Sequence, residues 1–393
     1  MILLEKNLKN KMYKEKGILL NEKIIKHKSR RIKTIKKSFK NNSKPRVKNK
    51  SKFVFKKNII LIITALITLI ISLFLIYKKY IKKKFHNIPI AFSFSDRYSY
   101  PLIVLLTSIL YNASPNTFYT FYLLINPDVK EYIIKKIFDL REIYPNCKIE
   151  IINMGNKYSN YGTLEYRSVA VYYRLELSDI IKNVDKIIYL DVDTIVHKDL
   201  SEMYNIDMGN YYYMGFPDHD LTIRKFNGTR NFINSGVMLI NLKKLREVNA
   251  PKLFQDYYSK HGSKKVDEYL INAVFYDKIK FLPLEYGIPD FGAGGSYTVS
   301  PSGFWRGFGG YVNFTKEDMI NASKNRAITH NCYEHTKWWE RRFRKLTKIG
   351  KQWLFYAAKS NVFDDICKKY NQIEHHCERI KNESKYNTFP LEF

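Results

Sequence analysis

The chain carries a pair of carboxylates in a position that suits a divalent metal ion. Residues 186–199 read KIIYLDVDTIVHKD, an apolar run that leads directly into Asp191 and Asp193. Side chains two residues apart on a strand point to the same side, so both carboxylates can approach one hard cation. Burying two carboxylates costs free energy unless a metal or a cationic group compensates them. The pattern predicts a metal site beside a phosphate-bearing ligand; alternatively, the two acids accept hydrogen bonds from turn amides at the strand end.

Alternating segments along the chain indicate which elements position these carboxylates. Short β-rich runs such as IPIAFSF, TFYTFYLLI and KIEIINM are separated by amphipathic segments, and YYYMGF, GVMLINL and KIKFLPL follow later. Such alternation is typical of βαβ units with a parallel sheet. Ligands bind at the carboxyl ends of strands in open parallel sheets, so residues 94–98 and 191–193 are expected to face one crevice. We therefore expect one compact Rossmann-like α/β domain.

Five segments, in this order along the chain, resemble glycosyltransferase family 8, the family of glycogenin and lipopolysaccharide galactosyltransferases. They are FSFSDRYSYPLIVLLTSIL (92–110), VYYRLELSDII (171–181), the YLDVD strand, FINSGVMLINLKKLR (232–246) and DEYLINAVF (267–275). The resemblance extends from residue 88 to about residue 339. It implies a GT-A fold that binds a nucleotide sugar. It also implies retaining, metal-dependent transfer of a hexose from a UDP-sugar to a glycan, lipid or protein acceptor.

The resemblance implies the rest of the metal site. In the family a distant histidine is the third protein ligand, and His330 in ITHNCYEHTKWWE corresponds to it. Lys337 is the implied diphosphate contact, and Asp191 also belongs to the donor site. An O,O,N donor set suits Mn²⁺, which accepts imidazole more readily than Mg²⁺ does. The segment departs from the family pattern, because His330 and Lys337 are seven residues apart instead of six, a glycine is absent and Trp338 replaces a proline. His335 is a second candidate ligand, and both histidines are alternatively surface residues.

The resemblance also implies contacts to the nucleotide. SFSDRYSYPL resembles the turn that binds the base, where Tyr98 is expected to stack on uracil with Ser93 and Ser95 nearby. Alternatively, Tyr98 is an ordinary half-buried aromatic residue. Arg174 stands where the family has a basic residue that contacts the diphosphate or the sugar, and a guanidinium binds oxyanions bidentately. Alternatively, it forms a surface ion pair with a neighbouring acid. Val192, between the two aspartates, is assigned to the donor site as well.

Two further segments are implied to hold the donor sugar. Asn234, Ser235 and Gly236 resemble the loop that binds sugar hydroxyls, since an amide both donates and accepts hydrogen bonds. Asp267 and Glu268 resemble an Asp-Gln pair beside the reacting centre, with Asp267 on sugar hydroxyls and Glu268 in place of the usual glutamine. Both acids also complement the dipole at the start of a helix. The family supplies no well-placed nucleophile, so Glu268 is the one carboxylate to test for that role.

The N-terminal part of the chain has a different composition. Residues 1–57 hold 21 Lys and Arg against 3 Glu, which predicts a disordered basic tail. Residues 58–77 carry no charge and are long enough, at about 1.5 Å per residue, to cross a bilayer, so we expect a transmembrane signal anchor. The tail is more basic than the stem at 78–87, which predicts a cytoplasmic N-terminus. The catalytic domain at 88–345 and a charged, helical extension at 346–393 would then be extracytoplasmic, in the Golgi or endoplasmic reticulum of a eukaryote.

The distribution of charge and cysteine narrows the function classes. The net charge of the chain is +30, but only +7 of it belongs to residues 86–393, so we expect no nucleic-acid partner. The basic tail either contacts anionic lipid or has no partner. Four cysteines are too few for a disulfide-built domain, and Cys367 and Cys377 are the closest pair. An alternative to the enzyme is a catalytically inactive, membrane-anchored relative that binds nucleotide sugar or glycan, which the altered 330–339 segment and Glu268 would explain.

Overall fold

The computed structural model of the chain describes residues 61–76, 86–162, 168–217, 232–262, 266–289, 315–331, 337–339, 348–370 and 373–384. The chain divides into two compact units, Met1–Lys79 and Tyr80–Phe393. In the first unit, residues 61–76 form a helix with exposed side chains. Within the described ranges no helix is both long and apolar enough to cross a membrane, so the transmembrane helix predicted over 58–77 is not found there. The predicted basic tail, and the predicted stem up to residue 85, lie outside the described residues.

The second unit is built around a mostly parallel sheet. Seven strands of the described residues form it, in the order β3-β2-β1-β4-β7-β6-β8. All neighbouring pairs are parallel except those made by β7, which runs antiparallel to β4 and β6. This confirms the predicted α/β fold, with one reversed strand that the run of apolar segments does not reveal. The strands are β1 (His86–Phe94), β2 (Thr117–Ile125), β3 (Cys147–Asn153), β4 (Lys186–Leu190), β6 (Tyr213–Pro217), β7 (Ile233–Asn241) and β8 (Ile279–Phe281).

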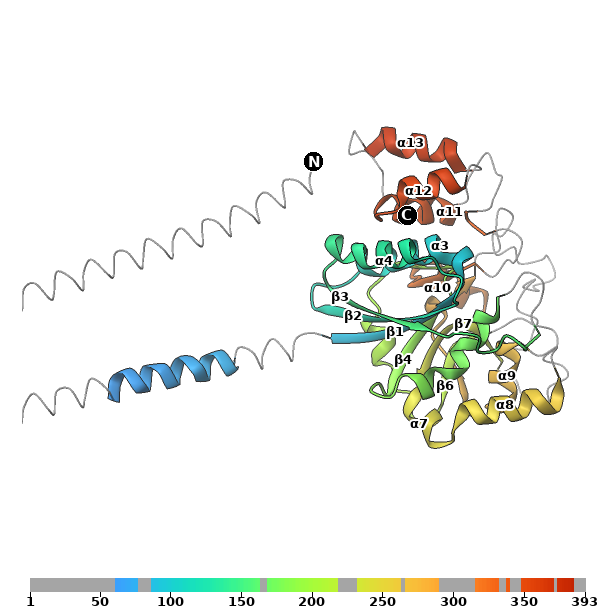
Figure 1. Cartoon of the computed structure of the whole chain (residues 1–393), viewed down its shortest axis with the longest axis horizontal. Helices are drawn as coiled ribbons and strands as arrows, with labels where there is room; N and C mark the ends of the chain where they lie inside the picture. The colour runs from blue at the N-terminus through green and yellow to red at the C-terminus, as the bar shows by residue number, and fades with distance from the viewer. Residues whose placement is uncertain are drawn as a thin grey trace, which may run out of the picture. The chain divides into compact units, whose positions relative to one another are not determined.

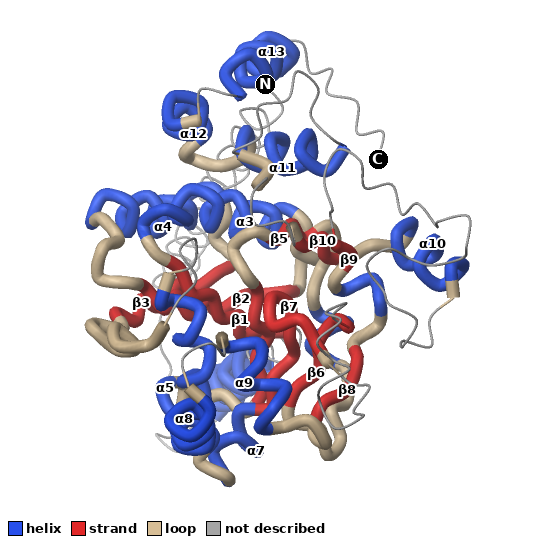
Figure 2. Tube along the Cα trace, turned by 90° about the vertical axis from the view of Figure 1, so that its right-hand side faces the viewer, coloured by secondary structure: helices blue, strands red, loops and turns tan. Residues whose placement is uncertain are grey.

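Helices cover both faces of the sheet because both faces are apolar. Along β4, Ile188 and Leu190 belong to one buried cluster, and the alternate residues Ile187 and Tyr189 belong to another. Figures 1 and 2 show α3 and α4 over the first face and α7, α8 and α9 over the second. Strands buried on both sides read as continuous apolar runs, as these do. The helices are α3 (Ser99–Tyr111), α4 (Glu131–Ile143), α5 (Leu177–Ile180), α6 (Ser201–Asn205), α7 (Leu242–Glu247), α8 (Ala250–His261) and α9 (Asp267–Val274), with 3₁₀ turns η1 (Asp96–Tyr98), η2 (Val169–Glu176) and η4 (Leu284–Tyr286).

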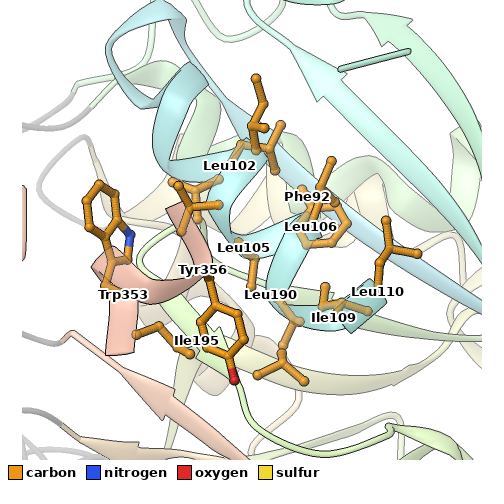
Figure 3. Close-up of a cluster of buried hydrophobic side chains, with 14 of the residues drawn as sticks. Phe92, Leu102, Leu105, Leu106, Ile109, Leu110, Leu190, Ile195, Trp353 and Tyr356 are labelled. Atoms are coloured by element: carbon orange, nitrogen blue, oxygen red, sulfur yellow. The ribbon is translucent and has the colours of Figure 1, made fainter. Parts of the chain in front are cut away.

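The C-terminal helices extend the core beyond the α3 layer. Trp353 and Tyr356 of α11 pack against leucines of α3, as Figure 3 shows. Asn112, at the end of α3, donates a hydrogen bond of 2.8 Å to the hydroxyl of Tyr356. A disulfide between Cys367 and Cys377 joins α12 to α13, the pair that the sequence spacing favoured. The bounds are α10 (Lys316–Lys324), α11 (Lys348–Ala358), α12 (Phe363–Lys369) and α13 (Glu374–Ser384).

A small second sheet lies at the carboxyl end of β4 and was not predicted. In the described part of the chain it has three strands in the order β5-β10-β9: β5 (Thr194–Val196), β10 (Ile328–His330) and β9 (Ile288–Pro289). β10 pairs antiparallel with β5, and its last residue, His330, lies opposite Thr194. This pairing brings His330 next to the Asp191–Asp193 turn.

Candidate metal and donor site

The two aspartates lie on a turn between the main sheet and the small sheet. Asp191 directly follows β4, and its backbone N–H donates to Gly236 O on β7 at 2.7 Å. Thr194 closes the turn by donating its hydroxyl to Asp191 O at 2.8 Å. The backbone carbonyl of Asp193 accepts from Asn331 N, just after β10, at 2.9 Å. Strands on both sides therefore fix the backbone of the turn.

His330 completes a three-residue group that could hold a metal ion. Its Nε2 atom lies 3.3 Å from Asp193 Oδ1 and 3.9 Å from Asp191 Oδ2. One ligand atom from each residue lies within 4.8 Å of the other two, so the three residues could hold a metal ion between them. Gly236 keeps this space open, because a Cβ there would lie 2.8 Å from Asp191 Oδ2 and closer still to the His330 ring. The position and the O,O,N donor set both fit a divalent metal.

Each aspartate uses its other oxygen to bind an internal cation. Arg174 Nη2 lies 2.7 Å from Asp191 Oδ1, and Lys337 Nζ lies 2.5 Å from Asp193 Oδ2. Burial alone would raise the pKa of Asp193, but Lys337 and His330 outweigh it and hold that pKa below its usual range. The carboxylate therefore stays ionised at neutral pH, as a metal ligand must be.

Lys337 reaches the site despite the altered sequence around it. Its Nζ also donates to the carbonyl of Asn331, the residue that follows β10, at 3.0 Å. The next two residues, Trp338 and Trp339, are 1% exposed and anchor this segment in the core. The seven-residue spacing that departs from the family pattern therefore still brings Lys337 to the carboxylates. His335 lies outside the described residues.

Arg174 joins the Asp191 carboxylate to the predicted sugar-binding residues. Its side chain is 4% exposed, and its Nε lies 3.2 Å from Asp267 Oδ2. Its Nη1 donates to Ser235 O at 2.6 Å and to Ser235 Oγ at 3.0 Å. Burial disfavours the charge of Arg174, but Asp191 and Asp267 outweigh it and raise the pKa above its usual value. Arg174 therefore forms buried ion pairs with Asp191 and Asp267, and the alternative of a surface ion pair is wrong.

Residues 234–236, expected in a loop, lie at the start of strand β7 and are held by the first turn of α9. Glu268 Oε2 accepts hydrogen bonds from Asn234 Nδ2 and Ser235 N, both at 3.0 Å. Ser235 Oγ donates to Asp267 Oδ2 at 2.9 Å, and Gly236 N donates to Asn234 Oδ1 at 2.9 Å. All five residues predicted for the sugar-binding region therefore lie together. Glu268 Oε2 therefore helps to hold the start of β7 in place.

The residues predicted to bind the base lie at the carboxyl end of β1. Ser93 is in β1, and its hydroxyl lies 2.6 Å from the hydroxyl of Tyr189. Ser95 is buried, and its carbonyl accepts from Tyr98 N at 2.9 Å. The half-buried ring of Tyr98 packs edge-on against Trp339 with centroids 6.2 Å apart. Val192, in the turn between the aspartates, is 7% exposed.

Sequence reasoning missed two residues that order the site. Tyr189 contacts Asp191 through its hydroxyl at 3.2 Å, and only its place two residues earlier on the same strand could have indicated this. Asn272 of α9 bonds Ile233 N and Ile233 O, each at 2.8 Å, and Glu268 O at 2.8 Å. A polar side chain in the apolar run DEYLINAVF was the available signal, because a buried amide needs partners.

The fold and the site define a class of protein: an α/β domain of GT-A type with an Asp-Asp-His group that could bind a metal. The chain belongs to glycosyl transferase family 8, whose family model matches residues 89–343. The resemblance inferred from the motifs is thereby confirmed.

Known proteins with related sequences or folds agree with this assignment. A Haemophilus influenzae protein, provisionally named a glycosyltransferase, is 32% identical over 201 residues, covering 48% of this chain and 59% of that protein. General stress protein A of Bacillus subtilis is 24% identical over 170 residues, covering 38% and 59%. The chain thus spans 59% of the length of each of these relatives.

Solved structures share the fold. The WbbM bifunctional glycosyltransferase has a TM-score of 0.59 at 20% identity, covering 72% of this chain and 51% of WbbM. The TM-score is 0.55 for an active-site mutant of LgtC and 0.53 for the galactosyltransferase LgtC in complex with donor and acceptor sugar analogues. Both LgtC structures are 21% identical and cover 70% of this chain and 96% of LgtC.

Proposed function

We propose that the protein is a retaining, metal-dependent glycosyltransferase that moves a hexose from a UDP-sugar to a glycan, lipid or protein acceptor. The observation that carries the proposal is the group of Asp191, Asp193 and His330 at the strand ends of a family 8 domain. Two buried cations, Arg174 and Lys337, flank this group. Such a collection of charges suits a diphosphate and its counter-ion.

Different residues of the chain would have different roles in the reaction. Asp191, Asp193 and His330 would hold a divalent ion, which we propose is Mn²⁺ and which would supply Lewis-acid stabilisation of the negative charge on the leaving diphosphate. Lys337, whose ammonium group pairs with Asp193, would contact the diphosphate. Asn234, Ser235 and Asp267 would hold the sugar hydroxyls, and Tyr98 would bind the base. No carboxylate is assigned as nucleophile, because Glu268 Oε2 accepts two hydrogen bonds from Asn234 and Ser235 at the start of β7.

The galactosyltransferase LgtC, solved with donor and acceptor sugar analogues, supports the choice of a nucleotide sugar and a glycan as ligands. Retention of anomeric configuration is proposed from the family resemblance.

The location of the protein stays a prediction from the sequence. The charge-free run at 58–77 between two basic segments predicts a signal anchor, with the catalytic unit in the lumen of the Golgi or endoplasmic reticulum in a eukaryote. Protease treatment of sealed vesicles tests it, because a luminal catalytic unit is digested only after the vesicles are opened with detergent. Digestion in sealed vesicles would contradict the predicted orientation.

A panel of UDP-sugars tests the proposed reaction. The purified full-length chain is incubated with each sugar and an acceptor mixture, with Mn²⁺ or with EDTA, and released UDP is measured. We expect release from one or a few sugars with Mn²⁺ and none with EDTA. Binding of UDP without release from any sugar would instead favour the catalytically inactive relative.

A further inference from the structure

The hydroxyl of Tyr189 belongs to a chain of hydrogen bonds that ends on a candidate metal ligand. Tyr189 lies in β4 and is fully buried. Its oxygen lies 2.6 Å from Ser93 Oγ and 3.2 Å from Asp191 Oδ1. An ionised carboxylate can only accept, so the phenol donates its single proton to Asp191. The hydroxyl of Ser93 must then donate to Tyr189, which fixes the direction of the whole chain.

The strand geometry explains why these three side chains meet. β1 and β4 are parallel neighbours, with Ala91 opposite Tyr189. Ser93 lies two residues beyond Ala91, and Asp191 lies two residues beyond Tyr189, so the period of two places them on one face of the sheet. The Arg174 guanidinium lies on the same face, 4.4 Å from the centre of the Tyr189 ring.

Two donors therefore hold one oxygen of the Asp191 carboxylate. Arg174 Nη2 donates to Oδ1 at 2.7 Å, and the Tyr189 hydroxyl donates to the same atom. The other oxygen, Oδ2, faces His330 Nε2 at 3.9 Å. Rotation about χ2 of an aspartate is broad when nothing restrains it, so an unrestrained side chain would present either oxygen. With Oδ1 held, Asp191 presents Oδ2 to the site.

We infer that Tyr189 is a positioning residue which, with Ser93, orients the Asp191 carboxylate for metal binding. The inference rests on the proposed metal-dependent function. It gives the Ser93 hydroxyl a task different from the predicted contact with the nucleotide base. Hydrogen-bond partners that orient metal ligands affect metal affinity strongly, and their loss costs about 10-fold or more.

The test measures Mn²⁺ binding without nucleotide or sugar. The full-length chain and its Tyr189→Phe, Ser93→Ala and doubly substituted variants are titrated with Mn²⁺, and free Mn²⁺ is followed by electron paramagnetic resonance. We expect Tyr189→Phe to weaken Mn²⁺ binding about 10-fold. Ser93→Ala should weaken it less, and the double variant should bind as Tyr189→Phe does, because both changes break one chain.

Tyr119→Phe is the matched control. Tyr119 is also fully buried, donates to a carboxylate oxygen of Asp199 at 3.1 Å and accepts from Leu200 N at 3.2 Å. It lies near the start of β2, whereas the site lies at the carboxyl ends of β1 and β4. We expect its removal to lower the melting temperature without changing the affinity for Mn²⁺.

The outcomes separate this inference from the proposed function. Wild-type affinity for Mn²⁺ in folded Tyr189→Phe overturns the inference, and so does an equal loss of affinity in Tyr119→Phe. If Tyr189→Phe does not fold, the Mn²⁺ affinity of Ser93→Ala is the test, and wild-type affinity in that variant overturns the inference. The proposed function survives if the wild-type chain binds Mn²⁺ and releases UDP, even when these variants bind Mn²⁺ as well as the wild-type chain does. Failure of the wild-type chain to bind Mn²⁺ removes the metal-dependent function as well.

Discussion

Replacement of Arg174 by methionine should destabilise the catalytic unit, because it leaves two carboxylates without their cation. Methionine keeps most of the length of the side chain and removes its charge. Asp267 is itself 3% exposed and lies 3.2 Å from Arg174 Nε, and Asp191 lies 2.7 Å from Nη2. Water cannot replace the lost partner at Asp267, so that charge would be poorly compensated, whereas Asp191 is 27% exposed and stays partly hydrated.

The magnitude follows from the burial of this network. Removing one partner of a buried ion pair costs about 3–5 kcal/mol in the free energy of unfolding. For a unit of this size each kcal/mol lowers the melting temperature by about 2 °C, so we expect a fall of about 6–10 °C. Arg174→Lys should recover part of it, since lysine keeps the charge but not the planar fork that reaches several acceptors at once.

Thermal unfolding of the metal-free variants measures this effect. The control is Lys135→Met, which removes a cation 77% exposed from its ion pair with Asp139 on α4. Exposed pairs contribute about 0–1 kcal/mol, so this variant should melt within about 2 °C of the wild-type chain. Equal melting temperatures for Arg174→Met and Lys135→Met would refute the argument that Arg174 compensates buried charge.

Three further predictions follow from other parts of the unit. Gly236→Ala adds a methyl group 2.8 Å from Asp191 Oδ2, so Mn²⁺ affinity should fall at least about 10-fold by titration, and unchanged affinity would contradict the tight packing. Cys367→Ser removes the disulfide to Cys377, which closes a loop of sequence separation 10, and should lower the free energy of unfolding by about 2.7 kcal/mol. Reduction should lower the melting temperature of the wild-type chain but not that of the variant. Burial lowers the pKa of His197 to about 3, so the unfolded chain takes up a proton below about pH 6.5 that the native chain does not. The free energy of unfolding should therefore fall by up to about 1.4 kcal/mol per pH unit as the pH drops from about 6.5 toward 3. In His197→Gln the free energy of unfolding, measured with denaturant, should depend less on pH over that range.

The local pattern of the sequence was enough to predict the sheet and the aspartate pair. Alternating apolar and amphipathic segments predict the α/β layers, and the aspartate pair was expected at the end of a strand. The expected strand periodicity does not apply to the pair, because Asp191 and Asp193 lie on the turn between β4 and β5. His330 was found only through the family resemblance, because it is brought to the aspartates by pairing of β5 with β10 across more than a hundred residues. No local period encodes such a pairing, and for the same reason the small second sheet and the reversed strand β7 were not predicted.

The partners of individual charged and polar side chains were harder to predict. Arg174 has acidic neighbours in the sequence, yet its partners are Asp191, on the turn after β4, and Asp267, at the start of α9. Tyr189 reads as a core aromatic in an apolar strand, and its hydroxyl becomes informative only once β1 and β4 are paired. Glu268 was the one carboxylate considered as a nucleophile. In the structure its Oε2 atom accepts hydrogen bonds from Asn234 and Ser235 at the start of β7.

The most direct test of the account compares the full-length chain with the Asp191→Ala/Asp193→Ala variant in Mn²⁺-dependent release of UDP from the donor that the panel identifies. The variant removes both carboxylates of the candidate metal site and leaves His330 in place. The account predicts that the wild-type chain releases UDP with Mn²⁺ and not with EDTA, and that the folded variant releases none above background. Equal release by the variant, or release by the wild-type chain in EDTA, would contradict a metal-dependent reaction at Asp191 and Asp193.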